Sequence, residues 1–252
     1  MFLVLILLQI SLLIRDVSSI TDGYVAEQSA FGFVASIWTN GVLRCTGGII
    51  HPRYILTAAI CVKDIPLHTM SIGTGKVGLY DVGLHFSTVE RVVIHPDFTV
   101  FVFGVQDLSV NTINNIAVLK LSAALQLGSE RYAISLANNK AASCVCQISG
   151  WSSGWGPMDP SRHLVHFFAN PLTPLECLQR GALVLLNHFC AIDLYGMRSI
   201  SLTDIGGIFV SEGKAFGIIV GSVARPAPAP EVIILPIYPY LSFLFDVLKG
   251  VL

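Results

Sequence analysis

Thr203-Asp204-Ile205-Gly206-Gly207 is the stretch of this sequence that decides the fold. At its centre stands an alkyl side chain, which can neither lose a proton nor attack a carbonyl. Three earlier segments accompany it in a fixed order: Ile20-Thr21-Asp22-Gly23, Leu56-Thr57-Ala58-Ala59-Ile60-Cys61 and Asn115-Ile116-Ala117-Val118-Leu119-Lys120-Leu121. Each segment alone is a weak signal, so the interpretation depends on their shared order and spacing.

Around these segments the chain alternates short β-rich runs with turn residues. Ten such runs and almost no helical periodicity predict an all-β sandwich or barrel. The expected strands are 33–38, 48–50, 54–58, 89–94, 116–121, 147–151, 182–186, 208–210, 215–220 and 232–237. From Tyr240 to Val251 apolar residues recur at helical spacing, which predicts a C-terminal helix with one face packed on the body.

The four segments resemble, in order and spacing, those of the trypsin/chymotrypsin (S1) family of serine proteases. Residues 203–207 resemble its Gly-Asp-Ser-Gly-Gly signature, with isoleucine in place of the attacking serine. Cys45-Thr46-Gly47-Gly48, Ile148-Ser149-Gly150-Trp151 and Phe189-Cys190-Ala191 extend the resemblance over nearly all of residues 20–252. It implies two six-stranded antiparallel Greek-key barrels and a C-terminal helix, with the first barrel over about residues 20–125, the second over about 126–252, and the site in the cleft between them.

The resemblance also assigns the catalytic positions. The family needs a serine to attack, a histidine to take its proton and a carboxylate to orient that histidine. The matching positions here are Ile205, Ile60 and Asn115, so all three roles are absent. Loss of a triad costs around a million-fold in turnover, and Thr203 replaces a glycine whose backbone helps to bind the oxyanion. The resemblance therefore implies an insect-type protease homologue that has no catalytic residues.

The replacements form a set. Without its histidine, a buried aspartate would be an unpaired charge, whereas Asn115 is neutral and can find local hydrogen bonds. Val220 stands where the family uses a serine to support that aspartate. We therefore expect Ile60, Ile205 and Val220 to pack together as a dry apolar plug.

Positions of the substrate pocket differ from the family in the same direction. Ser199 stands where a trypsin-like specificity needs aspartate, so nothing there attracts a basic side chain. Gly221 replaces the family's tryptophan platform, and Glu231 stands where a glycine keeps the pocket open. These residues predict a blocked pocket.

Asp204 is retained. In the family this carboxylate pairs with an amine freed by cleavage of the zymogen, and Ile20 would supply it here. Residues 2–14 form an apolar run that is too short for a membrane span but suits a signal peptide, and Val17-Ser18-Ser19 provides small residues before the cut. We therefore expect residues 1–19 to be a signal peptide, the protein to be secreted, and cleavage to expose Ile20. The alternative is that Asp204 is solvated or caps a turn.

Six cysteines in an exported chain indicate disulfide bridges, although six allow about 15 pairings. The resemblance implies the bridges Cys45–Cys61 and Cys177–Cys190. Cys144 and Cys146 are left over, and they can be free, bridged to each other or available for an intermolecular link. No tetrahedral ligand set is evident for a metal, His163 and His166 should point to opposite faces of a strand, and no cofactor is expected.

Composition narrows the class of partner. The net charge is −1 and basic residues form no run, so neither nucleic acid nor an anionic membrane surface is expected. With 53% hydrophobic and 12% charged residues, few polar side chains remain to cover a monomer, which favours a protein partner. No membrane span is expected in the mature chain.

Three functions follow in order of preference. The first is a secreted pseudoprotease that acts by binding a protease, an inhibitor or another component of an extracellular protease cascade. The second is a chain without a selected partner. The third is a residual or unconventional serine-type endopeptidase, which an active-site-directed serine probe would distinguish from the first.

Overall fold

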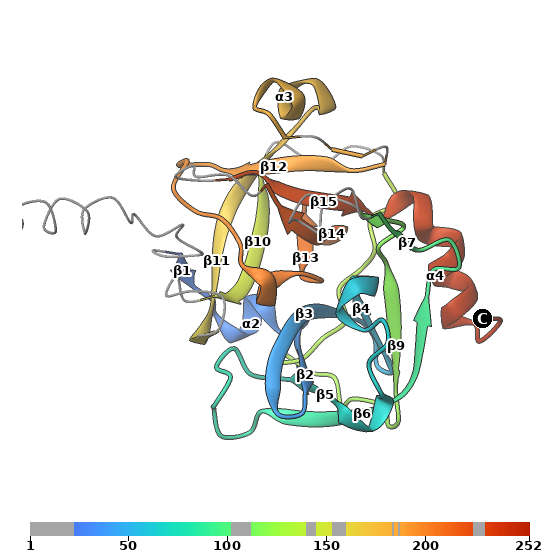
Figure 1. The fold of residues 1–252 in the computed structure, drawn as a ribbon. Helices are drawn as coiled ribbons and strands as arrows, with labels where there is room; N and C mark the ends of the chain where they lie inside the picture. The colour runs from blue at the N-terminus through green and yellow to red at the C-terminus, as the bar shows by residue number, and fades with distance from the viewer. Residues whose placement is uncertain are drawn as a thin grey trace, which may run out of the picture.

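The computed structural model describes residues 23–101, 112–139, 145–152, 160–182, 184–185, 187–223 and 230–252. Two closed barrels of antiparallel strands lie against each other, as Figure 1 shows, with the first barrel below the second. The prediction of an all-β protein with two six-stranded barrels and a C-terminal helix is confirmed. None of the helices in the described residues is long and apolar enough to cross a membrane.

The first barrel closes through the strand order β2-β3-β4-β9-β6-β5. Its centre is filled by alkyl side chains, and Ile37, Ile55 and Leu119 are fully buried. The hairpin between the first two strands turns at Asn40-Gly41, where φ is positive at both residues, as such tight turns require. The strands are β2 (Val34–Thr39), β3 (Val42–His51), β4 (Tyr54–Thr57), β5 (Met70–Thr74), β6 (His85–Ile94) and β9 (Ala117–Leu121).

The second barrel follows the order β11-β10-β13-β14-β15-β12 and closes because β12 also pairs with β11. Phe167, Phe209 and Ile219 are fully buried in its own hydrophobic cluster. The strands are β10 (Cys146–Ser152), β11 (Pro160–Leu172), β12 (Phe189–Asp193), β13 (Ile208–Ser211), β14 (Lys214–Ser222) and β15 (Val232–Pro236).

Shorter elements connect and cover the barrels. The strands β7 (Thr99–Val100) and β8 (Thr112–Ile113) form a separate pair. The α-helices are α2 (Gln28–Phe31), α3 (Pro174–Gln179) and α4 (Leu241–Leu248), and the 3₁₀ helices are η1 (Ala59–Cys61), η2 (Leu67–Thr69), η3 (Leu202–Asp204) and η4 (Tyr238–Tyr240).

The C-terminal helix is shorter than predicted. α4 ends at Leu248 because Gly250 adopts a φ of +74° and donates to the Val247 carbonyl, while Val251 donates to the Asp246 carbonyl. This pair of hydrogen bonds satisfies the last carbonyls of a helix and reverses the chain. Val251 is therefore exposed, whereas the expected apolar face includes the buried Leu244 and Val247.

One predicted strand is wrong. Among residues 182–186, the described ones form no strand, because β12 already pairs with β11 on one side and β15 on the other, which completes the ring. The remaining predicted strands are present. Three longer strands, β5, β11 and β12, were not among the ten expected runs, although His163 and His166 of β11 were expected to lie on a strand.

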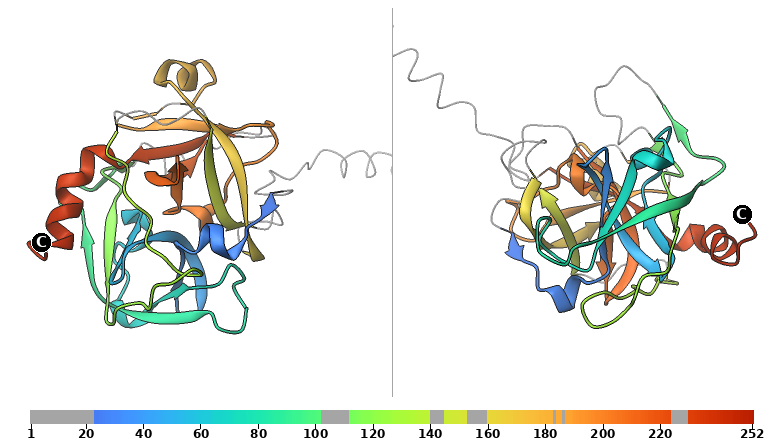
Figure 2. Two further views of the ribbon diagram at one scale, coloured as in Figure 1. Left: turned by 180° about the vertical axis from the view of Figure 1, so that it is seen from behind. Right: turned by 90° about the horizontal axis from the view of Figure 1, so that it is seen from below.

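The two ends of the chain cross over between the barrels. β1 (Tyr24–Val25) lies at the start of the described chain but pairs with Val165 and His166 of β11 in the second barrel. α4 is the last element but lies beside the first barrel (Figure 2). The ring of Phe243 in α4 is 5.0 Å from the ring of His95, which follows β6. The N-terminal strand β1 therefore packs on the C-terminal barrel, and the C-terminal helix α4 packs on the N-terminal barrel.

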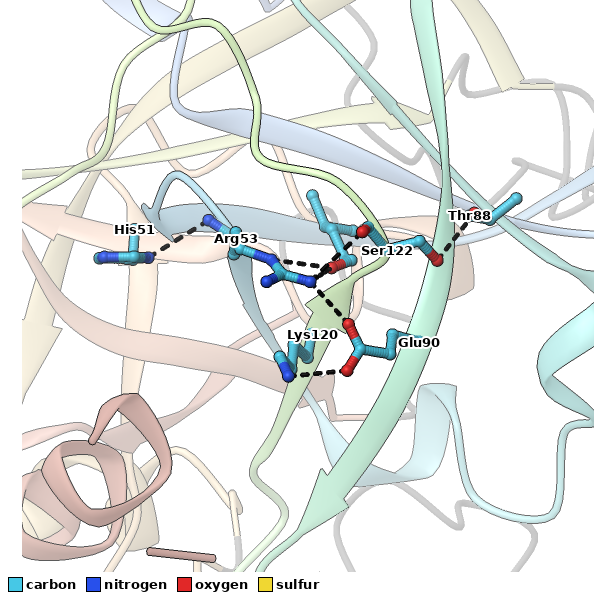
Figure 3. Close-up of polar contacts among 7 residues, drawn as sticks. His51, Arg53, Thr88, Glu90, Lys120 and Ser122 are labelled. Carbon is cyan, nitrogen blue, oxygen red and sulfur yellow. Dashed lines mark hydrogen bonds and ion pairs between the residues drawn. The ribbon is translucent and has the colours of Figure 1, made fainter. Parts of the chain in front are cut away.

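A polar cluster on the first barrel joins strands β6 and β9 to the turn before β4. Arg53, which precedes β4, lies 2.6 Å from Glu90 of β6, and Lys120 of β9 lies 2.7 Å from the other oxygen of the same carboxylate (Figure 3). Arg53 also donates to the carbonyls of Leu121 and Ser122. The hydrogen bond from Lys120, followed by the charges of Lys120 and Arg53, holds the pKa of Glu90 below its usual value.

We expect Glu90→Gln to lower the thermal unfolding midpoint slightly at pH 7 and by a smaller amount at pH 3. Because the folded-state pKa of Glu90 is lowered, the stabilisation is present above the unfolded-state pKa of about 4.3 and is lost as the pH falls through the folded-state pKa. Calorimetry of both proteins at the two pH values measures the effect. An equal difference in midpoint at pH 7 and pH 3 would contradict this explanation.

Candidate functional site

Two of the predicted site residues are joined directly. The backbone N–H of Ile60, in η1, donates to Oδ1 of Asn115 at 2.9 Å. The amide nitrogen of Asn115 donates in turn to Oγ1 of Thr112 at 3.1 Å, and the side chain is fully buried. A neutral amide thus fills both a donor and an acceptor role where an aspartate would bring an unpaired charge.

The neighbouring residue ties this loop to the C-terminal helix. Asn114 has a φ of +52°, and its Oδ1 accepts a hydrogen bond of 2.8 Å from the hydroxyl of Tyr240. Burial raises the pKa of Tyr240 to about 12, so the phenol stays protonated and remains a donor at neutral pH. The loop that carries Asn115 is therefore fixed from two sides.

The loop that carries Ile205 is held between the two barrels. Thr46 of β3 donates from its backbone to the Ile205 carbonyl and from its hydroxyl to the Thr203 carbonyl, both at 2.9 Å. On the other side, Gly206 donates to the Ile219 carbonyl of β14 at 2.8 Å. Gly206 has a φ of +85°, and a Cβ there would lie 2.1 Å from Oγ1 of Thr57. Only glycine lets the loop approach β4 so closely.

Alkyl side chains surround this meeting point. Val220 is fully buried, Ile205 is 7% exposed, and both belong to one hydrophobic core. Ile60 is half-buried and packs against the same core. All three residues therefore belong to or border the hydrophobic core that both barrels share, and their packing together as a plug stays a prediction.

The backbone N–H of Ile205 is engaged within its own turn. It donates to the carbonyl of Leu202 at 3.3 Å, because η3 continues to this residue as a 3₁₀ turn. An oxyanion site needs backbone N–H groups aimed at the place where negative charge develops. Here that donor points back to a carbonyl of the loop.

Asp204 is fully buried, which removes the prediction that it is solvated. Its Oδ2 accepts a hydrogen bond of 2.8 Å from the backbone N–H of Ser201 and so caps η3, one of the alternatives that the sequence left open. The carboxylate lies so close to β10 that a Cβ on Gly150 would be 1.9 Å from Oδ1. Ile20 and residues 1–19 lie outside the described residues, so the ion pair and the signal peptide stay predictions.

The predicted pocket residues are buried or lie in strands. Oγ of Ser199 donates to the Pro230 carbonyl at 3.1 Å, next to Glu231. Glu231 is fully buried, and its Oε1 is 3.9 Å from Nη1 of Arg180. Gly221 lies in β14 beside a bulge and pairs with Ile233. The buried carboxylate of Glu231 therefore occupies the position where the family has a glycine that keeps the substrate pocket open.

Residues 20–244 match the family model described as Trypsin. The chain belongs to this family. Trypsin-4 of Rattus norvegicus is 23% identical over 246 residues, which cover 96% of this chain and 94% of the relative. Trypsin delta and trypsin gamma of Drosophila melanogaster are each 26% identical over 207 residues, 79% of this chain and 77% of theirs.

A solved structure agrees with this trypsin-family fold. Neuropsin, a serine protease expressed in the limbic system of mouse brain, superposes with a TM-score of 0.76 at 21% identity, covering 90% of this chain and 99% of its own. The two disulfides that the resemblance implied are present, with S–S lengths of 2.03 Å for Cys45–Cys61 and 2.10 Å for Cys177–Cys190. Cys146 is buried in β10, while Cys144 lies outside the described residues.

Sequence reasoning missed two features of this trypsin-family chain. From the sequence, the motif Cys45–Gly48 was used only for its spacing. Thr46 in this motif binds the carbonyl of Thr203, 157 residues away, and no local sequence signal reveals such a partner. Two surface hollows were also unexpected, one of about 500 Å³ beside Trp38 and one of about 410 Å³ beside His166. His166 is partly buried, and its burial, followed by the charge of Arg198, lowers its pKa. The side chain of His163 is exposed.

Proposed function

We propose that this chain is a secreted, non-catalytic serine protease homologue that acts by binding protein, as a regulator of an extracellular protease cascade. In this role it resembles insect-type homologues that kept the fold without the triad. The partner is a protease, an inhibitor or another component of the cascade. Two disulfide bridges and membership of the trypsin family support secretion.

The single observation that carries this proposal is the contact of Ile60 with Asn115 beside the loop of Ile205. None of these side chains can supply a nucleophile, a general base or a carboxylate, which acyl transfer by this family requires. The hydrogen bond from Ile205 to the Leu202 carbonyl adds to this, because it engages a donor that an oxyanion would need.

The retained architecture supports binding. Thr46, Gly206 and Asp204 hold the loop through interactions that are fully buried or sterically tight, so the surface around it is rigid. A rigid surface loses little conformational freedom when it binds a partner. The same loops that present substrate-binding surfaces in an active protease would here present a protein-binding surface.

A fluorophosphonate probe tests the absence of a serine nucleophile. We expect less than about 1% labelling of the purified chain under conditions that label rat trypsin-4 fully, because a lost triad lowers turnover around a million-fold. Mass spectrometry of the intact protein measures the labelled fraction. Stoichiometric labelling would refute the proposal and favour a residual or unconventional serine-type endopeptidase.

The triple substitution Ile60→His, Asn115→Asp and Ile205→Ser tests the apolar plug separately. We expect no peptidase activity above the unsubstituted chain on peptide substrates with basic, aromatic or small residues before the cut. Near-ultraviolet circular dichroism verifies the fold of the variant, and Ile205→Ser alone serves as the milder control. Strong activity of a folded triple variant would show that the site is open. This would refute the apolar-plug hypothesis but leave the proposed function of the natural chain unchanged.

A further inference from the structure

A hollow of about 500 Å³ lies on the outside of the first barrel, and the predicted site residues Ile60, Asn115 and Ile205 do not line it. β2, β5 and β6 form its floor, and the loop between β5 and β6 forms its wall. In Figure 1 these elements lie at the lower end of the molecule. The lining residues used below are Trp38, Ser71, Tyr80, Asp81 and Phe86.

Two small residues of β5 pair with aromatic residues of the neighbouring strands. Ser71 pairs with Trp38, and Gly73 pairs with Phe86. The rings of Trp38 and Phe86 meet edge to face at 5.7 Å. The indole N–H of Trp38 donates to Oγ of Ser36 at 2.8 Å, so its polar atom is satisfied within the barrel. The hollow is therefore lined by aromatic carbon, whose faces carry partial negative charge.

A carboxylate is held at the rim of the hollow. Oδ2 of Asp81 accepts the backbone N–H of Gly78 at 3.1 Å, and the backbone N–H of Asp81 donates to the Gly78 carbonyl at 3.3 Å. A Cβ on Gly78 would lie 2.3 Å from this carboxylate, so the glycine permits the approach. The position of the charge is thus set before any ligand arrives.

Asp81 has no ion-pair partner among the described residues. Nζ of Lys76, in the same loop, forms an ion pair of 3.0 Å with Oε2 of Glu130 instead. Tyr80 and Phe86 are 63% and 49% exposed, so their rings are accessible to a partner. Aromatic faces together with a preset carboxylate complement a cation and repel an anion.

We propose that this hollow binds the guanidinium group of an arginine side chain on a protein partner. A guanidinium stacks on aromatic faces and sheds water more readily than an ammonium group does, while its planar donors match a carboxylate. Two exposed rings around a single carboxylate offer both contacts to one planar cation. The proposal does not depend on whether the chain is catalytic.

The test uses two peptides that differ only in charge. Acetyl-Gly-Arg-Gly-amide carries the guanidinium, and acetyl-Gly-citrulline-Gly-amide carries a neutral urea of the same shape. Two-dimensional ¹H–¹⁵N NMR spectra of the full secreted chain follow both titrations. We expect the arginine peptide to bind with a dissociation constant on the order of 1 mM, at least about 5-fold more tightly than its neutral analogue, and to shift the signals of Trp38, Ser71 and Phe86.

Two substitutions locate the charge and the ring. Asp81→Asn keeps an oxygen for the Gly78 N–H but removes the charge, so we expect about 5-fold weaker binding. Phe86→Leu should weaken it by about 2- to 5-fold. Glu27→Gln, which removes an exposed carboxylate beside the other hollow, is the matched control and should change nothing.

Three results would overturn the assignment. The first is equal binding of the two peptides, the second is unchanged affinity in Asp81→Asn, and the third is a set of shifts confined to the hollow beside His166. Each of these is independent of fluorophosphonate labelling, so failure here and failure of the proposed function can be told apart.

Discussion

Asn115→Asp is expected to lower the free energy of unfolding by about 3 kcal/mol at pH 7. The side chain of Asn115 is fully buried, and its partners are the backbone N–H of Ile60 and the hydroxyl of Thr112. The hydroxyl can reverse and donate to a carboxylate, so the hydrogen bonds survive. The cost comes from the buried charge, because removing a carboxylate from water is unfavourable.

The loss should shrink as the pH falls. Burial favours the neutral form of the introduced carboxyl group, so the folded variant binds its proton more tightly than the unfolded variant does. By linkage, the stability of the variant relative to the natural chain rises when the pH is lowered from 7 to 4. Urea unfolding at both pH values measures this difference.

Asn40→Asp is the matched control for this substitution. It makes the same chemical change in the exposed hairpin turn before Gly41, where aspartate tolerates a positive φ. We expect a change within about 0.5 kcal/mol at either pH. Equal losses in the two variants, or a loss at residue 115 that does not depend on pH, would contradict the burial argument.

Gly206→Ala is expected to lower the free energy of unfolding by about 3 kcal/mol or more. A Cβ would lie 2.1 Å from Oγ1 of Thr57 and 2.3 Å from the carbonyl oxygen of Thr46. The second neighbour is backbone of β3, so the loop must move as a whole. The φ of +85° adds strain for any residue with a Cβ.

Gly213→Ala separates these two costs. Gly213 has a φ of +70°, and a Cβ there has no neighbour within 4 Å. This variant carries the backbone strain without the clash, and we expect a loss of about 1 kcal/mol. Urea unfolding of both variants gives the comparison. If the two losses are equal, the close packing of the loop on β3 and β4 does not stabilise the fold.

Local sequence patterns predicted much of the fold. They failed where pairing with distant strands determined whether a segment became a strand. The run 182–186 has the composition of a strand, but short apolar runs do not specify their partners, and β12 holds that place in the ring. β11 was recognised only as a strand around His163 and His166, because histidines, an asparagine and a proline interrupt its alternation, yet β10, β12 and β1 all pair with it. Thr173-Pro174-Leu175-Glu176 is a readable capping box that begins α3, so this helix was within reach of the sequence.

The candidate site was predictable to a similar degree. Motif order indicated which residues would meet, and the Ile60–Asn115 hydrogen bond joins two of them. The turn that engages the Ile205 N–H was not predictable, because a 3.3 Å bond to Leu202 depends on the backbone path of η3. The aromatic hollow was also not predictable from the sequence, because Trp38 and Phe86 lie on two different strands and Asp81 lies in a loop.

The exchange of ends between the barrels has a consequence for how the protein is made. β1 leaves the ribosome early, but its partner β11 is synthesised only after the first barrel is complete, and α4, which covers that barrel, comes last. The first barrel therefore cannot finish its packing before residues 241–248 have been synthesised. A cut between Leu121 and Cys146 would leave one piece without its helical cover and the other without its edge strand, so we expect the two barrels to fold as one unit.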